Sequence, residues 1–316
     1  KDQDYDMFIE TWWGQEEGDS DEPYSIDDIL ASGVFLQRED IEFFLRKLEE
    51  KKAIIIQGPP GTGKTFIARK LAFALMQEKD LNRLEFIQFH QSYSYDDFIR
   101  GYRPAQDDGG SFKIQNGIFF EFCQKAMEDP DRDYVFIIDE INRGNLSQIF
   151  GEVLMLIERD KRGKDFSVPL VYRKENEPRF YVPQNLYLIG LMNLADRSLA
   201  MVDYALRRRF GFIDLSPKFE SELYSQWLSD RLMKPNLINL IVSRMSSLNN
   251  VIREDPVLGE NYQIGHSYFC PRGDDFSGLS EDWYEGIILT EIIPLLKEYW
   301  FDSPSKVQDA IDNLLT

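Results

Sequence analysis

The chain has few residues for cross-links or metal binding. Its 316 residues include two cysteines, Cys123 and Cys270, and two histidines, His90 and His266. Two distant thiols do not make a disulfide framework, so we expect a reducing, cytoplasmic environment. The few Cys and His residues also lack the spacing of metal ligands. We therefore expect the histidines to be hydrogen-bonded structural residues.

Long apolar runs are absent as well. No stretch approaches the roughly 18 apolar residues of a membrane helix, and the first ten residues are charged. We expect neither a membrane span nor a signal peptide. The sequence also lacks a Gly-x-Ser-x-Gly elbow, a Cys/His nucleophile pair and an Asp…Glu-x-Lys arrangement. It therefore predicts neither an esterase-type hydrolase nor a nuclease.

Positive charge is scarce. Lys and Arg number 36 against 55 Asp and Glu, which gives a net charge of −19. Such a surface repels phosphate backbones unless its cations cluster. Contact with DNA would therefore need a separate basic module, a ring that gathers cations, or a partner subunit. With 43% hydrophobic residues, the chain can bury large cores, and its length suits two packed domains.

Short β-branched runs alternate with helical periodicity in the first two thirds of the chain. Strands are predicted at residues 53–57, 85–89, 134–138, 186–192 and 212–215, with helices at 41–48, 66–76 and 146–159. This alternation is typical of an α/β fold with a parallel sheet covered on both faces. We assign residues 24–215 to this domain. Residues 1–23, acidic and containing Trp12 and Trp13, are predicted to be a linker or arm, or a frayed end.

Helical patterns dominate after residue 215. They cover residues 223–232, 237–249, 286–299 and 305–315, so residues 216–316 form a predicted helical domain.

Two segments of the first domain interrupt the alternation of strands and helices. Residues 102–117, with turn chemistry at 107–110, and residues 166–182 are each predicted to be a β-hairpin.

The first chemical motif is the phosphate-loop pattern G-x-x-x-x-G-K-[ST], which the sequence matches at Gly58-Pro59-Pro60-Gly61-Thr62-Gly63-Lys64-Thr65. It lies between a predicted strand and a predicted helix, as its mechanism demands. The glycines let backbone N–H groups surround phosphate oxygens at the positive end of the helix. Lys64 would contact the β- and γ-phosphates, and the Thr65 hydroxyl would bind Mg²⁺.

Polar residues end the next two predicted strands. Asp139 can hold Mg²⁺, and Glu140 beside it can orient and polarise the attacking water. Asn193 can donate to the γ-phosphate or position the water, or else begin an Asx turn. Asp196 and Arg197, in the loop that follows, could brace the site or a subunit contact. These positions meet where α/β sheets bind ligands.

Three consecutive arginines, Arg207 to Arg209, follow a helical stretch. Cations at the end of a helix stabilise its dipole, but three exceed what a helix end needs. We predict that one reaches the γ-phosphate of a neighbouring subunit, with Arg208 the first candidate and Arg209 the second. His266 could contact nucleotide from the helical domain, as the alternative to a structural role.

The order of these motifs resembles that of the AAA+ superfamily, and four strings resemble the McrB family. They are Phe89-His90-Gln91-Ser92-Tyr93-Ser94-Tyr95, Ile138-Asp139-Glu140-Ile141-Asn142-Arg143, Met192-Asn193-Leu194-Ala195-Asp196-Arg197-Ser198 and Asp203-Tyr204-Ala205-Leu206-Arg207-Arg208-Arg209-Phe210. The resemblance runs from about residue 24 to the end of the chain. It implies an AAA+ P-loop NTPase with a parallel sheet and a C-terminal helical lid.

The resemblance further implies GTP hydrolysis with Mg²⁺, a homo-hexameric ring and a McrC-type nuclease partner. Members of this family carry a separate reader domain for methylated cytosine, and no segment of this chain resembles it. The AAA+ layout would place the base near residues 24–35, where Asp27 and Asp28 are available. Leu194 stands where the family has Thr, which puts base choice or ring assembly in doubt. Both predicted hairpins would be surfaces for McrC or DNA, or plain decoration.

Three hypotheses follow. The first is a GTP-driven ring motor that translocates DNA for 5-methylcytosine-specific restriction. The second is an ATP-dependent remodeller of protein complexes on the same fold. The third is a nucleotide-locked scaffold that barely hydrolyses, against which Glu140 and Asn193 argue.

Overall fold

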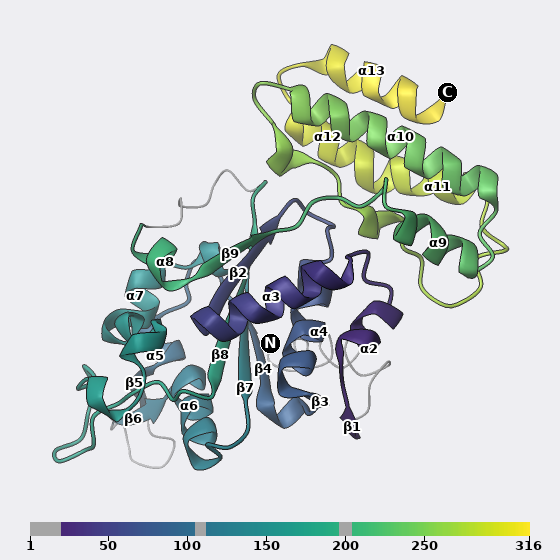
Figure 1. Cartoon of the computed structure of the whole chain (residues 1–316). Helices are drawn as coiled ribbons and strands as arrows, with labels where there is room; N and C mark the ends of the chain where they lie inside the picture. The colour runs from purple at the N-terminus through teal and green to yellow at the C-terminus, as the bar shows by residue number, and fades with distance from the viewer. Residues whose placement is uncertain (1–19, 105–111, 196–203) are drawn as a thin grey trace.

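The structure is a computed structural model that describes residues 20–104, 112–195 and 204–316 (Figure 1). Several sequence expectations fall outside these ranges. They concern Trp12 and Trp13 of the arm, the turn at residues 107–110, and Asp196 and Arg197 of the loop after Asn193.

A five-stranded parallel sheet forms the centre of the first domain (Figure 1). Its spatial order is β4 (Leu84–Gln88), β7 (Tyr134–Asp139), β8 (Leu186–Asn193), β2 (Ala53–Gly58) and β9 (Gly211–Asp214). These are the five predicted strands, so the α/β prediction is confirmed. The carboxyl ends of β7, β8 and β2 lie side by side at one edge of the sheet.

Both faces of the sheet are buried. On β2, Ile55 packs into one apolar cluster, whereas Ile54 and Ile56 pack into another. The first cluster includes α5 (Tyr95–Phe98), α6 (Ile118–Glu128) and α7 (Leu146–Phe150). The second includes α2 (Ile26–Ala31), α3 (Arg38–Lys51) and α4 (Lys64–Met76). Because alternate strand residues enter opposite cores, the strands read as continuous apolar runs.

One predicted helix is interrupted. The sequence predicts a single helix over residues 146–159, but α7 ends at Phe150 and a 3-10 segment, Gly151–Ile157, follows. Gly151 has φ 51°, which breaks the α-helical path at that point. The prediction of one continuous helix is wrong.

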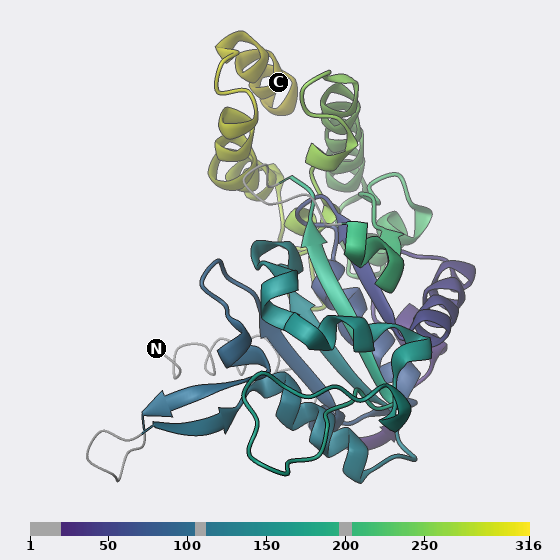
Figure 2. The ribbon, with the colours of Figure 1, turned by 90° about the vertical axis from the view of Figure 1, so that its left-hand side faces the viewer.

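The two predicted hairpins differ in outcome. β5 (Arg100–Pro104) and β6 (Phe112–Asn116) pair antiparallel and project away from the body of the domain (Figure 2). Residues 166–182 instead make a single antiparallel bridge between Val168 and Phe180, so the two strands predicted there are wrong. Pro169 and Pro178 flank this bridge and have no N–H to extend the ladder.

Residues 216–316, the helical lid, pack around a third apolar cluster. The lid contains α9 (Glu222–Asp230), α10 (Pro235–Glu254), α11 (Glu281–Ile287), a π-helical turn, α12 (Ile293–Tyr299) and α13 (Pro304–Leu315). It meets the first domain at the carboxyl ends of the strands (Figure 1). No helix in the described ranges has the length and apolarity to cross a membrane.

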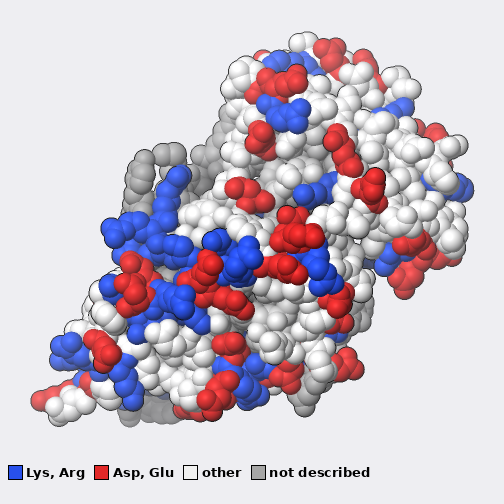
Figure 3. All heavy atoms as spheres, viewed as in Figure 1, with Lys and Arg blue, Asp and Glu red and all other residues white. Residues whose placement is uncertain are grey.

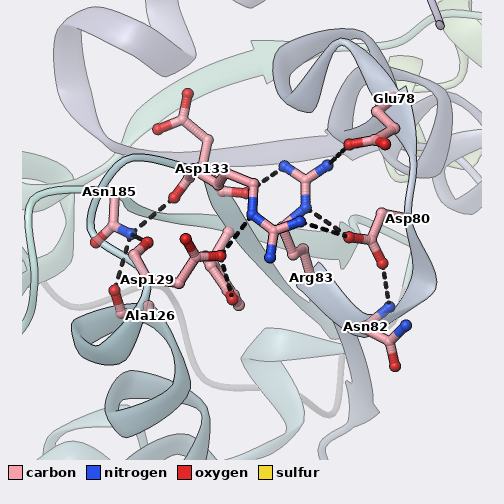
Figure 4. A network of polar contacts seen from close by, with 10 residues as sticks. Glu78, Asp80, Asn82, Arg83, Ala126, Asp129, Asp133 and Asn185 are labelled. Carbon is pink, nitrogen blue, oxygen red and sulfur yellow. Dashed lines mark hydrogen bonds and ion pairs between the residues drawn. The ribbon is translucent and has the colours of Figure 1, made fainter. Parts of the chain in front are cut away.

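A polar network fixes the opposite, amino-terminal edge of the sheet (Figure 4). The buried Arg83 guanidinium pairs with Glu78 and Asp80 just before β4 begins. The Asn185 amide donates to the carbonyls of Ala126, Asp129 and Arg132 just before β8 begins. A short antiparallel sheet of β1 (Ser20–Pro23) and β3 (Glu78–Lys79) adjoins this network. We infer a structural role for it, because it lies at the far edge of the sheet from the phosphate loop.

Candidate functional site

The phosphate loop, residues 58–65, runs from the end of β2 to the start of α4. Gly61 and Gly63 have φ of 75° and 79°, in the left-handed region that favours glycine. A Cβ on Gly61 would also lie 2.7 Å from the Tyr268 ring. Gly63 precedes α4 and has no side chain to cap it, so the N–H groups of the first helical turn remain available to an anion.

Lys64 lies folded over this loop. Its Nζ donates to the carbonyl oxygens of Pro59, at 2.8 Å, and Gly58, at 3.1 Å. Burial lowers the pKa of Lys64 to about 8, while the negative charges of Glu140 and Asp139 act in the opposite direction. The amine is therefore within electrostatic reach of both carboxylates. Its hydrogen-bond partners are neutral carbonyls, so a phosphate, which makes stronger charge-assisted hydrogen bonds, can replace them.

Asp139 and Glu140 lie where β7 ends. The Asp139 carboxylate accepts a hydrogen bond from the Glu140 N–H at 2.9 Å, and burial is the main cause that raises its pKa. Such a desolvated carboxylate is stabilised by a nearby cation. Glu140 itself has φ 50°, a left-handed conformation that is costly for a residue with a side chain. Its carboxylate pairs with Arg143 Nε at 3.3 Å.

Asn193 ends β8 directly beside the phosphate loop, because it is the register partner of Gly58. Its Oδ1 is buried and has no hydrogen-bond partner within the described ranges. The Asn142 Nδ2 donates to the Asn193 carbonyl at 3.4 Å, and the Asn142 Oδ1 is likewise buried without a described partner. Two amide oxygens thus lie beside the acidic strand end. The sequence-based prediction gave Asn142 no role, although Asn142 stands in the same motif as Asp139 and Glu140.

The residues fit a magnesium ion. Asp139 supplies a carboxylate from β7, and Thr65 supplies a hydroxyl from the first turn of α4. Hard oxygen ligands of this kind are those that Mg²⁺ takes in nucleotide sites, with water and phosphate as the others. Among the described residues there is no group of three or more His, Cys, Asp or Glu that could hold a metal ion.

A hollow of about 40 Å³ adjoins the phosphate loop at Thr62 and Gly63. Its lining includes residues 33–36, Thr62, Gly63, Lys218 and His266. The buried His266 accepts a hydrogen bond from the Lys218 N–H on Nδ1 at 3.1 Å. Burial lowers the pKa of His266 to about 4, so the ring is neutral near pH 7, with its proton on Nε2. The lid therefore presents His266 beside the loop.

The structure does not bring Asp27 into this hollow. Asp27 lies on α2 with 79% of its side chain exposed and pairs with Arg38. The chain reaches the hollow only later, at residues 33–36. Asp28, the neighbouring carboxylate, is also turned away, because it caps α2 by accepting from the Ser25 N–H and hydroxyl.

The arginines lie in α8 (Tyr204–Arg209). Arg209 is mostly buried and forms an ion pair with Glu158 at 3.2 Å. Arg208 is exposed. Figure 3 shows Lys and Arg side chains gathered over α8, on a molecule whose acidic side chains are spread over both domains. Two arginines were predicted to reach the γ-phosphate of a neighbouring subunit. Arg208 is exposed and can reach another subunit, whereas Arg209 pairs with Glu158 in its own subunit.

Comparison with known proteins agrees with this geometry. Residues 53–210 match the family described as AAA domain, dynein-related subfamily, and residues 240–308 match the McrB alpha-helical lid domain. The chain belongs to the McrB family of AAA proteins. The resemblance inferred from the four motif strings is confirmed, and so is the helical lid.

Two curated relatives are similar over most of the chain. The EcoKMcrB subunit of a type IV methyl-directed restriction enzyme from Escherichia coli K12 is 51% identical over 295 residues, 93% of this chain and 63% of the relative. The YdiS component of the type II restriction enzyme BsuMI from Bacillus subtilis 168 is 25% identical over 281 residues, 77% of this chain and 78% of the relative. The chain thus spans less than two thirds of the length of the McrB relative.

The chain is also similar to a protein of known crystal structure from Cytophaga hutchinsonii. The similarity covers 72% of this chain and 65% of the other chain, with 18% sequence identity and a TM-score of 0.41.

Proposed function

We propose that this chain is the GTP-hydrolysing motor part of a McrBC-type, modification-dependent restriction system, acting in the cytoplasm. The observation that carries the proposal is the phosphate loop at the end of β2, with Lys64 folded over it and Asn193 in register with Gly58 beside it. The buried amide oxygen of Asn193 has no hydrogen-bond partner among the described residues. The 51% identity to the McrB subunit of Escherichia coli supports the assignment to restriction.

Each residue at the loop has a part in hydrolysis. The backbone N–H groups of the loop and Lys64 bind and orient the phosphates. Thr65 and Asp139 would hold Mg²⁺, which when bound neutralises charge on the β- and γ-phosphates. Glu140 orients the attacking water and withdraws its proton, and Asn193 fixes the position of that water. Glu140 must first leave its ion pair with Arg143.

The base would lie in the hollow lined by residues 33–36 and His266. Guanine presents N1–H and N2–H donors that adenine lacks, so its recognition needs acceptors. Main-chain carbonyls of residues 33–36 can serve, because the structure leaves Asp27 outside the hollow. The neutral His266 can donate to the nucleotide from the lid side. Family membership favours GTP over ATP.

A ring would complete the site. A cavity of about 390 Å³ lies beside the start of the phosphate loop, and its lining includes three carboxylates, of Asp214, Glu220 and Glu260, against one guanidinium, of Arg253. An acidic opening of this kind attracts a cation from a second subunit. We propose that the exposed Arg208 of a neighbour enters here in a homo-hexamer and stabilises the transition state. Such a contribution is worth about 10³ to 10⁵ in rate.

The partners follow from the same proposal. A McrC-type nuclease subunit would bind the ring and stimulate hydrolysis. DNA would be contacted through the assembled complex or through a reader domain, since this chain is acidic overall.

Competition binding followed by hydrolysis tests the proposal. A fluorescent GTP analogue bound to the chain should be displaced by GTP at lower concentration than by ATP. GTP turnover should rise when a McrC-type subunit is added. If ATP displaces the analogue more readily and drives the faster turnover, the chain is an ATP-dependent remodeller instead. If neither nucleotide binds, the assignment of the site is wrong.

A further inference from the structure

The lid touches the phosphate loop through main-chain hydrogen bonds. The Gly265 N–H donates to the Pro60 carbonyl at 3.0 Å, and the Ser267 N–H donates to the Gly61 carbonyl at 2.9 Å. The contact is so close that a Cβ on Gly265 would lie 1.9 Å from the Gly61 carbonyl carbon. Residues 264–267 of the lid therefore form a wall directly against the loop.

These bonds set the direction of the loop's own donors. In a planar trans peptide the C=O and the following N–H point in opposite directions. Because the lid holds the carbonyls of Pro60 and Gly61, the N–H groups of Gly61 and Thr62 point away from the lid. These N–H groups are among those that would surround a phosphate. The lid segment thus fixes the direction of the loop N–H groups that would surround a phosphate.

One side chain holds that lid segment in place. Asn249, on α10, is 5% exposed. Its Nδ2 donates to the Ile264 carbonyl at 2.9 Å, and its Oδ1 accepts from the Ile264 N–H at 2.6 Å. The Gln263 Nε2 adds a bond to the Asn249 carbonyl at 3.4 Å. A side-chain amide carries one donor group and one acceptor group, so it pairs with both main-chain groups of Ile264 as a neighbouring strand would.

We propose that Asn249 is a positioning residue for the phosphate loop. It acts through Ile264 and Gly265, and it does not touch the nucleotide. The chain of contacts runs from α10 through the Asn249 amide and the Ile264 backbone to the Pro60 and Gly61 carbonyls. The proposal deepens the proposed function and rests on it, because it assumes that a nucleoside triphosphate binds at the loop.

The test compares Asn249→Ala with Ser247→Ala, an exposed residue two positions earlier on the same helix. Affinity for a fluorescent GTP analogue and steady-state kinetics are measured on the full chain. For Asn249→Ala we expect Kd and KM to rise roughly tenfold and kcat to change less than about twofold. Ser247→Ala should match the parent. A merely structural role would reduce the active fraction, and hence kcat, and would leave Kd and KM at parental values.

A second variant changes the contact itself. Gly265→Ala places a methyl group against Gly61 at a backbone conformation, φ −75° and ψ 158°, that alanine adopts without strain. It should raise Kd and KM in the same direction. Because the effect is on the phosphates, the fold-change should be equal for GTP and ATP analogues. If Asn249→Ala fails to fold by circular dichroism, Gly265→Ala decides the question.

The outcomes separate the two claims. A parent protein that binds no triphosphate contradicts the proposed function. A parent that binds and hydrolyses, together with Asn249→Ala and Gly265→Ala variants that keep the parental Kd and KM, overturns the positioning role alone.

Discussion

Arg143 Nε lies 3.3 Å from Glu140 Oε2, so the carboxylate assigned to the attacking water is paired with a cation three residues further along the chain. Arg143 is about half exposed, with 44% of its side chain accessible. Pairs of this kind contribute about 0 to 1 kcal/mol. The pairing is therefore weak enough to be broken when a neighbouring subunit or a partner binds.

Replacing Arg143 with alanine should raise basal hydrolysis. The Glu140 carboxylate loses its cation and is free to orient water, and a pair worth up to 1 kcal/mol corresponds to roughly a two- to fivefold gain. Turnover of the isolated chain, without a McrC-type partner, measures it. A fall in turnover with unchanged nucleotide affinity would instead give Arg143 a direct part in the reaction.

Substitutions of Arg208 and Arg209 should have different effects. Arg208→Ala should lose at least about a hundredfold in turnover while binding nucleotide normally, because its partner phosphate is in the next subunit. Arg209→Ala should mainly lower stability, because Arg209 pairs with Glu158 in its own subunit. Mixing inactive Arg208→Ala with inactive Glu140→Gln should restore part of the activity. If mixed assemblies recover no activity, Arg208 does not act at the phosphate of a neighbouring subunit.

Nucleotide affinity should depend on pH through Lys64. Its pKa in the free protein is about 8, below the usual 10.5, so the amine loses its proton as pH rises through 8. Triphosphate attracts the protonated form, hence binding takes up a proton and weakens by up to about tenfold per pH unit above 8. Calorimetry of the parent chain with a non-hydrolysable GTP analogue between pH 7 and 9, in buffers of different ionisation enthalpy, measures the uptake. Affinity independent of pH over this range would contradict it.

Stability should fall in mild acid through His266. Its pKa is about 4 in the folded chain against 6.5 when unfolded, so the unfolded state binds more protons between these values. Stability from this group is complete above pH 6.5 and is lost as pH falls toward 4, by at most about 3 kcal/mol. His266→Gln keeps an acceptor for the Lys218 N–H but does not titrate. Denaturant unfolding at pH 7 and 5 should show a smaller loss for this variant than for the parent, and equal losses would contradict the assignment.

The sheet and the phosphate loop could be predicted because their signals are local. A β-branched run ending in the loop glycines requires a strand followed by a helix N-terminus, and Asp139 and Asn193 each end such a run. Parallel pairing then brings these strand ends together without further information. The interrupted helix after Phe150 and the missing strands near Val168 were not predicted, although Gly151, Pro169 and Pro178 were visible as signals.

The contacts between domains could not be predicted in this way. Asp27 fits a base site by type and by place in the chain, but its helix turns it to solvent and to Arg38. The contact of Gly265 with Pro60 joins main-chain groups about 200 residues apart, and main-chain hydrogen bonds between distant segments leave little trace in residue type. The ion pair of Arg209 with Glu158 likewise depends on how two separate segments pack.

The role of Glu140 as general base is tested by the turnover of Glu140→Gln, measured beside the parent with GTP and with ATP. The variant should bind triphosphate with the parental affinity while turnover falls by about 10² to 10⁴, the contribution of general-base catalysis. The parent should hydrolyse GTP in preference to ATP. A Glu140→Gln variant that hydrolyses nucleotide at the parental rate would show that Glu140 does not activate the water.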